Sequence, residues 1–222
     1  MSYRLTPLSG RFDFSGPEST TLLLDDADFC GLEIDGTLKW HKERSSKQFF
    51  MKNPEPNLTR LEDFLACSGV KHEIISGPFQ VNAALTDDNG RLSAGAFHLS
   101  SEGGVLKRMT LLAKIFTLIN FTDLYQGLFT SGFNYKLLEI DGHVADNLFI
   151  LDKAIMEGEG MDIIAQGNIN LQDLQTDLTI FIVPFKSIDK IINIVPLIGR
   201  IIGGKKRHII TYPVKVNGNL MN

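Results

Sequence analysis

One short pattern recurs along the chain: an apolar residue, a spacer, a glycine and then alternating apolar positions. It occurs at residues 8–14, 34–40, 75–81, 140–144, 165–171 and 216–220. Alternation of this kind is typical of a strand with one buried face, and a glycine within it indicates a bulge, a sharp bend or close backbone approach. The spacing between repeats varies, which argues against a solenoid of fixed period. The pattern predicts one long antiparallel sheet, bent repeatedly, with an apolar side and a polar side.

The alternation also predicts which side chains share a face. Apolar residues two positions apart should line one concave face of the sheet. The pairs expected there are Phe12 and Phe14, Leu38 and Trp40, Phe79 and Val81, and Phe97 and Leu99. A proline-containing connector at residues 53–57 interrupts the strands, and residues 58–66 then space apolar side chains at helical intervals, closed by Gly69. A short helix is expected there.

Two further segments change to a helical period. Residues 105–119 follow alternating four- and three-residue steps, which predicts an amphipathic helix with a broad apolar face. Residues 187–204 are rich in isoleucine and leave little polar face, and Pro196, which lacks an amide hydrogen, should kink this segment or begin a second helix. The expected fold is therefore a β-rich α+β fold: a long curved antiparallel sheet forming an open apolar groove, with an amphipathic helix and a C-terminal kinked helix pair.

Residues 187–204 allow two interpretations. The helix pair could plug the open end of the sheet, or it could contact lipid acyl chains or a membrane surface while basic residues reach phosphate head groups. The two are compatible if one face packs inward and the other meets lipid. The candidate lipid or membrane contacts are Ile191, Ile192, Val195, Leu197, Ile198, Ile201, Ile202, Lys205, Lys206 and Arg207.

Composition narrows the classes of function. The 222 residues are 43% hydrophobic with a formal net charge of -4, an ordinary globular balance that gives no reason to expect nucleic acid. The chain opens without an apolar leader and contains no apolar run of roughly 18 residues, so neither a signal peptide nor a membrane-spanning helix is expected. Cys30 and Cys67 are best interpreted as two separate thiols. A disulfide between them requires an oxidising compartment and close Cα atoms.

Candidate catalytic and metal-binding motifs are weak. Residues 199–206 match most of a phosphate-binding loop by spacing, but they lack the Ser or Thr that holds magnesium and follow a helix instead of a strand. No serine lies in a nucleophile-elbow motif. The histidines show no ligand-like spacing and are expected at the surface or half-buried: His41, His72, His98, His143 and His208. We expect no enzyme, no cofactor and no metal site.

The order of several short phrases in residues 70–222 carries a resemblance. They are SEGGVLKR at 101–108, LINFTDL at 118–124, GFNY at 132–135, GMDI at 160–163, GNI at 167–169, VPF at 183–185, IVPLIG at 194–199 and IGG at 202–204. In this order they resemble the C-terminal region of AsmA-like proteins, the superfamily that includes YhdP and TamB. Residues 1–57 share only the β pattern, as expected for the adjoining part of the same groove.

The resemblance implies a location and a function. Proteins of this family are anchored in the inner membrane by an N-terminal helix, project through the periplasm and carry phospholipid toward the outer membrane along an apolar groove. The anchor is missing from this sequence, so the chain is expected to be one β-groove segment, residues 1–222, of a longer protein. Its expected partners are phospholipid acyl chains, with a membrane surface or envelope proteins as further partners. The alternative function is an envelope assembly scaffold acting through edge-strand pairing with protein partners.

Overall fold

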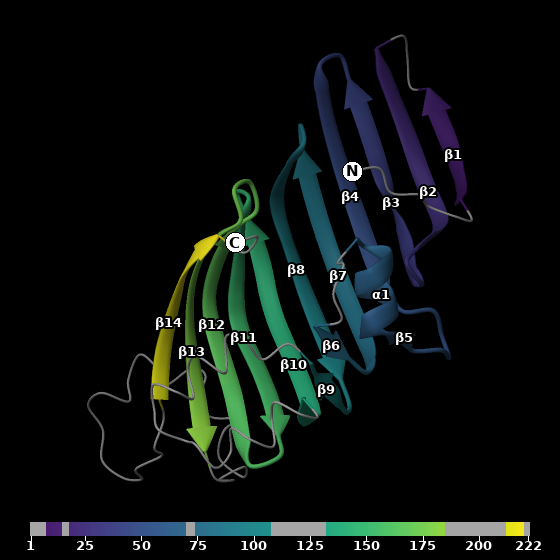
Figure 1. Ribbon diagram of the computed structural model, residues 1–222. Coiled ribbons are helices and arrows are strands. Elements are labelled where there is room, and N and C mark those ends of the chain that lie inside the picture. The colour runs from purple at the N-terminus through teal and green to yellow at the C-terminus, as the bar shows by residue number, and fades with distance from the viewer. Residues whose placement is uncertain (1–7, 15–17, 70–73, 108–131, 185–211, 220–222) are drawn as a thin grey trace, which may run out of the picture.

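The computed structural model describes residues 8–14, 18–69, 74–107, 132–184 and 212–219. Most of these residues belong to one antiparallel sheet, against which a single described helix lies (Figure 1). The elements are β1 (Leu8–Phe14), β2 (Ser19–Phe29), β3 (Leu32–His41), β4 (Arg44–Lys52), β5 (Thr59–Arg60), α1 (Leu61–Cys67), β6 (Ile75–Ser76), β7 (Pro78–Asp88), β8 (Arg91–Ser101), β9 (Gly104–Leu106), β10 (Phe133–Ala145), β11 (Leu148–Gly158), β12 (Met161–Asn170), β13 (Gln175–Pro184) and β14 (Tyr212–Asn219).

The long strands follow one another across the sheet in the order β1-β2-β3-β4-β7-β8-β10-β11-β12-β13-β14. The short strands lie off this path: β5 pairs with β7, β9 with β10, and β6 with β9. The sheet is open, with β1 at one end and β14 at the other (Figure 1). The predicted antiparallel, β-rich fold is therefore confirmed.

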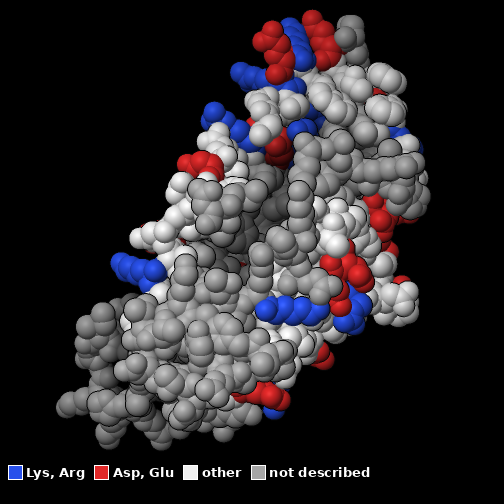
Figure 2. Space-filling model, viewed as in Figure 1, with Lys and Arg blue, Asp and Glu red and all other residues white. Residues whose placement is uncertain are grey.

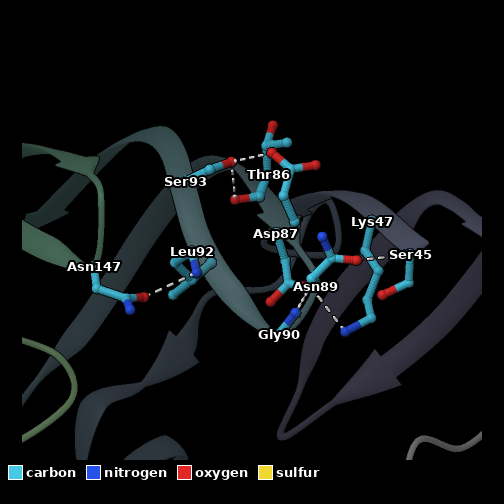
Figure 3. A network of polar contacts seen from close by, with 10 residues as sticks. Ser45, Lys47, Thr86, Asp87, Asn89, Gly90, Leu92, Ser93 and Asn147 are labelled. Atoms are coloured by element: carbon cyan, nitrogen blue, oxygen red, sulfur yellow. Dashed lines mark hydrogen bonds and ion pairs between the residues drawn. The ribbon is translucent and has the colours of Figure 1, made fainter. Parts of the chain in front are cut away.

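Asparagines in the hairpin turns hold neighbouring hairpins together at one end of the strands (Figure 3). Between β7 and β8, the Asn89 Oδ1 accepts from the Ser45 N–H and the Asn89 N–H donates to the Ser45 carbonyl, both at 2.8 Å. Between β10 and β11, Asn147 makes the same exchange with Leu92 at 3.0 and 2.8 Å. Both asparagines have positive φ, which this side chain tolerates well. Each turn thus continues the sheet's hydrogen bonding beyond the last ladder pair.

The main hydrophobic core lies at the opposite end of the strands. Its least exposed members come from five different strands and are no more than 1% exposed: Leu32, Phe79, Phe133, Met161 and Ile182. Leu61 of α1 joins this cluster at 5% exposure. The helix therefore covers the end of the sheet where packing is tightest.

The first predicted helix is confirmed with a later start. It begins at Leu61, because Thr59 and Arg60 pair with Phe79 and Pro78 as the short strand β5. Leu58, which fitted the helical spacing, lies outside the helix and is 47% exposed. The N-terminal cap position is Arg60, which makes no side-chain cap, while Glu62 and Asp63 place negative charge in the first turn.

The second predicted helix, residues 105–119, does not begin where the periodicity suggested. Val105 belongs to β9, whose residues pair with β10 and β6. Gly103, at φ 86°, turns the chain after β8 so that the next residues can form this short strand. Residues 108–119 of that predicted helix lie outside the described residues.

Candidate functional site: an apolar sheet face

Strand register places apolar side chains from all long strands on one face of the sheet. Phe12 of β1 lies opposite Leu22 of β2, which lies opposite Leu38 of β3. In the middle of the sheet, Met51, Ala83 and Phe97 follow one another across β4, β7 and β8. Toward the other edge, the same face carries Ile140 of β10, Met156 of β11, Ile163 of β12, Ile182 of β13 and Val214 of β14. We call this surface the apolar face and the opposite one the polar face.

The same-face pairs expected from the alternation are confirmed by this register. Leu22 of β2 lies opposite both Phe12 of β1 and Leu38 of β3. Thr20 of β2 likewise lies opposite both Phe14 and Trp40. Val81 lies opposite Leu99 two positions before the Ala83–Phe97 pair. All the named residues therefore lie on the apolar face: Phe12, Phe14, Leu38, Trp40, Phe79, Val81, Phe97 and Leu99.

Burial along the apolar face falls from the core end of the strands toward the turn end. Phe79 and Val81 are buried, whereas Phe49 and Phe97 are half-buried. Trp40 is 36% exposed, and at the β1 edge Phe12 and Phe14 reach 63% and 72%. Exposed apolar surface is unfavourable by about 25 cal/mol per Å². Part of this face therefore remains exposed to solvent.

Figure 2, in the view of Figure 1, shows where charged side chains gather. They cluster at the upper end of the molecule, around the turn end of β1–β4, along its margins and over the region of α1 and β5. Two ion pairs lie on the polar face, where Lys153 pairs with Glu139 at 2.6 Å and Lys52 with Glu33 at 3.4 Å. A third, between Lys47 and Asp87 at 2.9 Å, lies at the turn end of the apolar face. Over β11–β13, in contrast, the polar face carries a second buried apolar cluster, formed by Ile155, Ile164 and Val183. The two faces therefore differ in polarity over the rest of the sheet but not over these three strands.

The polar face also carries two histidine–aspartate pairs. His98 Nδ1 lies 2.6 Å from Asp141 Oδ1, and His143 Nδ1 lies 2.7 Å from Asp152 Oδ2. All four side chains border an open hollow of about 630 Å³ that is also lined by Phe50. The surface positions expected for these two histidines are confirmed, but the aspartate partners were not predicted. Because the pairs form between strands, their signal is in the sheet register and not in local spacing.

Glycines interrupt the apolar face where neighbouring side chains are large. A Cβ on Gly142 would lie 2.5 Å from Cε1 of Phe97, and one on Gly95 would lie 2.7 Å from Cδ2 of Leu85. The same Cβ atoms would also lie 2.7 Å from the backbone carbonyl oxygens of Ile150 and Ala84, so neither position has room for a side chain. The register puts six glycines on the apolar face: Gly10, Gly36, Gly95, Gly142, Gly167 and Gly218. The close approach expected from the recurring pattern is observed at five of these six glycines, whereas nothing lies within 4 Å of a Cβ placed on Gly218.

Helix α1 is fastened to the core end of the apolar face. Cys67, at its last position, forms a disulfide with Cys30 in the β2–β3 turn, with Cα atoms 5.6 Å apart. The interpretation as two separate thiols is therefore wrong. Phe64 packs between Phe29 and Phe79, with ring centroids 6.2 and 5.6 Å away. The helix consequently links β2, β3 and β7 across the face that it covers.

The first turn of α1 holds the bend between β6 and β7. The Gly77 N–H donates to Glu62 Oε2 at 3.0 Å, and the Leu61 N–H donates to the Gly77 carbonyl at 2.8 Å. Burial raises the pKa of Glu62, but hydrogen bonds from Gly77 and from its own backbone, together with Arg60, outweigh it. The resulting pKa of Glu62 lies below its usual value of 4.5. An ionised Glu62 therefore stabilises the bend.

A buried tyrosine occupies the neighbouring bend between β8 and β9. The Tyr135 hydroxyl donates to the Ser76 carbonyl and bonds the Ser101 hydroxyl, both at 2.9 Å. A Cβ on Gly77 or Gly104 would lie 2.6 or 2.4 Å from this hydroxyl oxygen, so the phenol fills a space that only glycine leaves open. Burial raises the pKa of Tyr135, and the Ser101 hydrogen bond lowers it by less.

The predicted lipid-contact residues of the segment 187–207 lie outside the described residues, as do His72 and His208. Within the described ranges, no cluster of three or more His, Cys, Asp or Glu side chains is arranged to hold a metal ion. In the same part of the chain, no helix has the length and hydropathy needed to cross a bilayer. Comparison with known proteins found no matching family model, no matching curated protein and no matching solved structure.

Proposed function

We propose that this chain is a non-catalytic lipid-binding segment that conducts phospholipid acyl chains along its apolar face. One observation carries the proposal: an apolar face runs from β1 to β14 and is only half-buried over much of its area. Acyl chains satisfy such a surface without directional contacts, so neither a catalytic residue nor a cofactor is needed. Selectivity among lipids would be low, and net transfer would follow a concentration gradient.

The glycines on the apolar face favour the shape that a conduit requires. Gly95 and Gly142 remove bulk from that face while the opposite face keeps its side chains. Glycine kinks are a means by which sheets acquire curvature. We therefore include in the proposal a groove that is concave on the apolar side, as the AsmA-like resemblance implies.

The proposed location is the periplasm, within a longer protein that is anchored in the inner membrane and acts between the inner and outer membranes. The Cys30–Cys67 disulfide supports an oxidising compartment, since disulfides persist there and are rare in the cytosol. The resemblance of residues 70–222 supports the same location. The described part of the chain supplies no membrane-crossing helix.

Two adjacent phenylalanines provide the sharpest test. Phe49 lies on the apolar face and Phe50 on the polar face, where it is 42% exposed. The photoreactive analogue benzoylphenylalanine is placed at either position, and the purified proteins are irradiated with phospholipid bearing unmodified acyl chains. The proposal predicts lipid adducts at position 49 and at most a small fraction of them at position 50. Equal labelling, or labelling at position 50 alone, would contradict it.

The C-terminal segment calls for a separate test. Lys205, Lys206 and Arg207 are proposed to attract anionic head groups, each by about 1 kcal/mol at low salt. Liposome co-sedimentation of the wild type is compared with that of a variant carrying glutamate at all three positions. The variant should bind anionic vesicles more weakly at low salt, with the difference fading as salt rises. Equal binding by both proteins would indicate that the segment serves only as a structural plug.

The alternative function, an envelope assembly scaffold, rests on the two open edges of the sheet. β1 and β14 each have one partner strand among the described residues. Unpaired edges can accept strands of other proteins. Native mass spectrometry after purification separates the two functions. Bound phospholipid favours the conduit, whereas a lipid-free chain carrying a stoichiometric envelope protein favours the scaffold.

A further inference from the structure

The edge strand β1 has a sequence that is complementary to itself. It reads Leu-Ser-Gly-Arg-Phe-Asp-Phe from Leu8 to Phe14, with Phe12 at the centre of an oppositely charged pair. When two copies run antiparallel with Phe12 facing Phe12, Arg11 of each copy lies opposite Asp13 of the other. On the apolar face, Phe14 of each copy then lies opposite Gly10 of the other. The large phenylalanine side chain therefore meets a residue that has no side chain.

We propose that β1 pairs in this register with β1 of a second copy of the chain. A two-fold axis perpendicular to the sheet preserves the faces, so the apolar face of one copy continues into that of the other. The pairing covers the most exposed large apolar side chains of the described chain, Phe12 at 63% and Phe14 at 72%. It also satisfies backbone groups that an edge strand otherwise leaves to solvent.

The charges of β1 are available for this pairing. The Arg11 side chain is 75% exposed, and its ion pair with Asp25 within the chain is long, at 3.8 Å between Nε and Oδ2. Oppositely charged residues directly opposite each other stabilise an antiparallel pair, and like charges destabilise it. The proposed register places two attractive pairs on the polar face and none that repel.

The other edge lacks these features. β14 contains Pro213, which has no N–H to donate, and a single charged residue, Lys215. Proline and lysine on an edge strand are common means of preventing edge-to-edge association. No register of β14 against itself pairs opposite charges, because Lys215 has no acidic residue in its own strand. The two edges therefore differ, and the dimer forms through β1.

Charge exchange tests the register. The wild type should have twice the 24.7 kDa mass of the chain in light scattering at micromolar concentration. Arg11→Glu alone and Asp13→Lys alone each create two like-charge pairs, so each should weaken dimerisation at least tenfold. Mixing these two variants makes every pair attractive again, and a heterodimer of near wild-type affinity should form. Circular dichroism of the single variants confirms that the monomer remains folded.

A crosslink supplies an independent readout. Phe12→Cys places two thiols on the two-fold axis, within the Cβ separation of about 4.5–5.5 Å typical of facing strand residues. Phe14→Cys is the control, because its thiols would lie four residues from each other, about 13 Å apart along the strands. Mild oxidation should give a covalent dimer only with Cys at position 12.

Three results would overturn the inference. A wild type that is still monomeric at a concentration on the order of 100 micromolar would show that this interface does not form. A dimer that neither charge variant weakens would place the interface elsewhere. Equal crosslinking at positions 12 and 14, or open-ended polymers instead of dimers, would contradict the register and the two-fold symmetry. The inference does not depend on lipid binding, since each measurement is made on lipid-free protein.

Discussion

The Tyr135 hydroxyl is a buried polar group with two defined partners, and its removal tests how the bent ends of the strands are held. Tyr135 is 3% exposed and Ser101 is 2% exposed, so water cannot easily replace either partner. Tyr135→Phe deletes two hydrogen bonds of 2.9 Å while keeping the ring that packs in the core. The Ser76 carbonyl and the Ser101 hydroxyl then lose that partner.

The expected loss of stability follows from the number of hydrogen bonds removed. A typical buried hydrogen bond contributes about 0.5–1.5 kcal/mol net, so the loss of two should lower the free energy of unfolding by about 1–3 kcal/mol. Ser101→Ala removes one of them and should cost about 1 kcal/mol. In the Tyr135→Phe background the same change should cost little, because the hydroxyl has already lost its partner. The coupling in the double-mutant cycle should be about 1 kcal/mol.

Urea unfolding of the four proteins, with the disulfide intact, measures these values. Ser100→Ala in the same strand is the control, since Ser100 lies on the polar face and its loss should change the free energy by less than about 0.5 kcal/mol. Strictly additive costs for Tyr135→Phe and Ser101→Ala would refute the shared bond. A Tyr135→Phe protein as stable as the wild type would show that these hydrogen bonds do not stabilise the bend.

Two further predictions concern α1 and the bends that it holds. Because Cys30 and Cys67 are 37 residues apart, replacing both by serine should lower the free energy of unfolding by about 3–4 kcal/mol in the chain-entropy model. A reductant should lower the free energy of unfolding of the wild type by the same amount and leave that of the variant unchanged. Glu62 has a depressed folded pKa, so its contribution is present above its unfolded pKa and is lost as pH falls through the folded pKa. Glu62→Gln should therefore destabilise at pH 7 but match the wild type in strongly acidic urea titrations, and an equal gap at both pH values would contradict this reasoning.

The faces of the sheet could be predicted because alternation is a local property. Phe12, Leu38 and Phe97 each have apolar neighbours two residues away, and this period alone places them on one side of their strands. Antiparallel pairing in chain order then aligns these sides across the sheet. The recurring glycines were local signals of the same kind, and all of them except Gly218 lie where neighbouring segments approach closely.

Features that depend on distant segments were missed or misread. The Cys30–Cys67 disulfide requires α1 to dock beside the β2–β3 turn, and no spacing in the sequence reports that proximity. The His98–Asp141 pair joins residues 43 apart, so it follows only from the register of β8 against β10. In the segment starting at Val105, the apolar period suggested a helix, but pairing with β6 and β10 makes its first residues a strand.

Trp40, the single tryptophan, gives the most direct test of the apolar face as a lipid-binding surface. It lies on that face, 36% exposed, next to the exposed Lys39 on the polar face. Phospholipids with brominated acyl chains quench tryptophan fluorescence on contact. The account predicts a blue shift with unbrominated lipid and strong quenching with brominated lipid for the wild type, and little of either for a Lys39→Trp, Trp40→Phe variant. Equal quenching of both proteins, or none of the wild type under conditions where lipid co-purifies with it, would contradict the account.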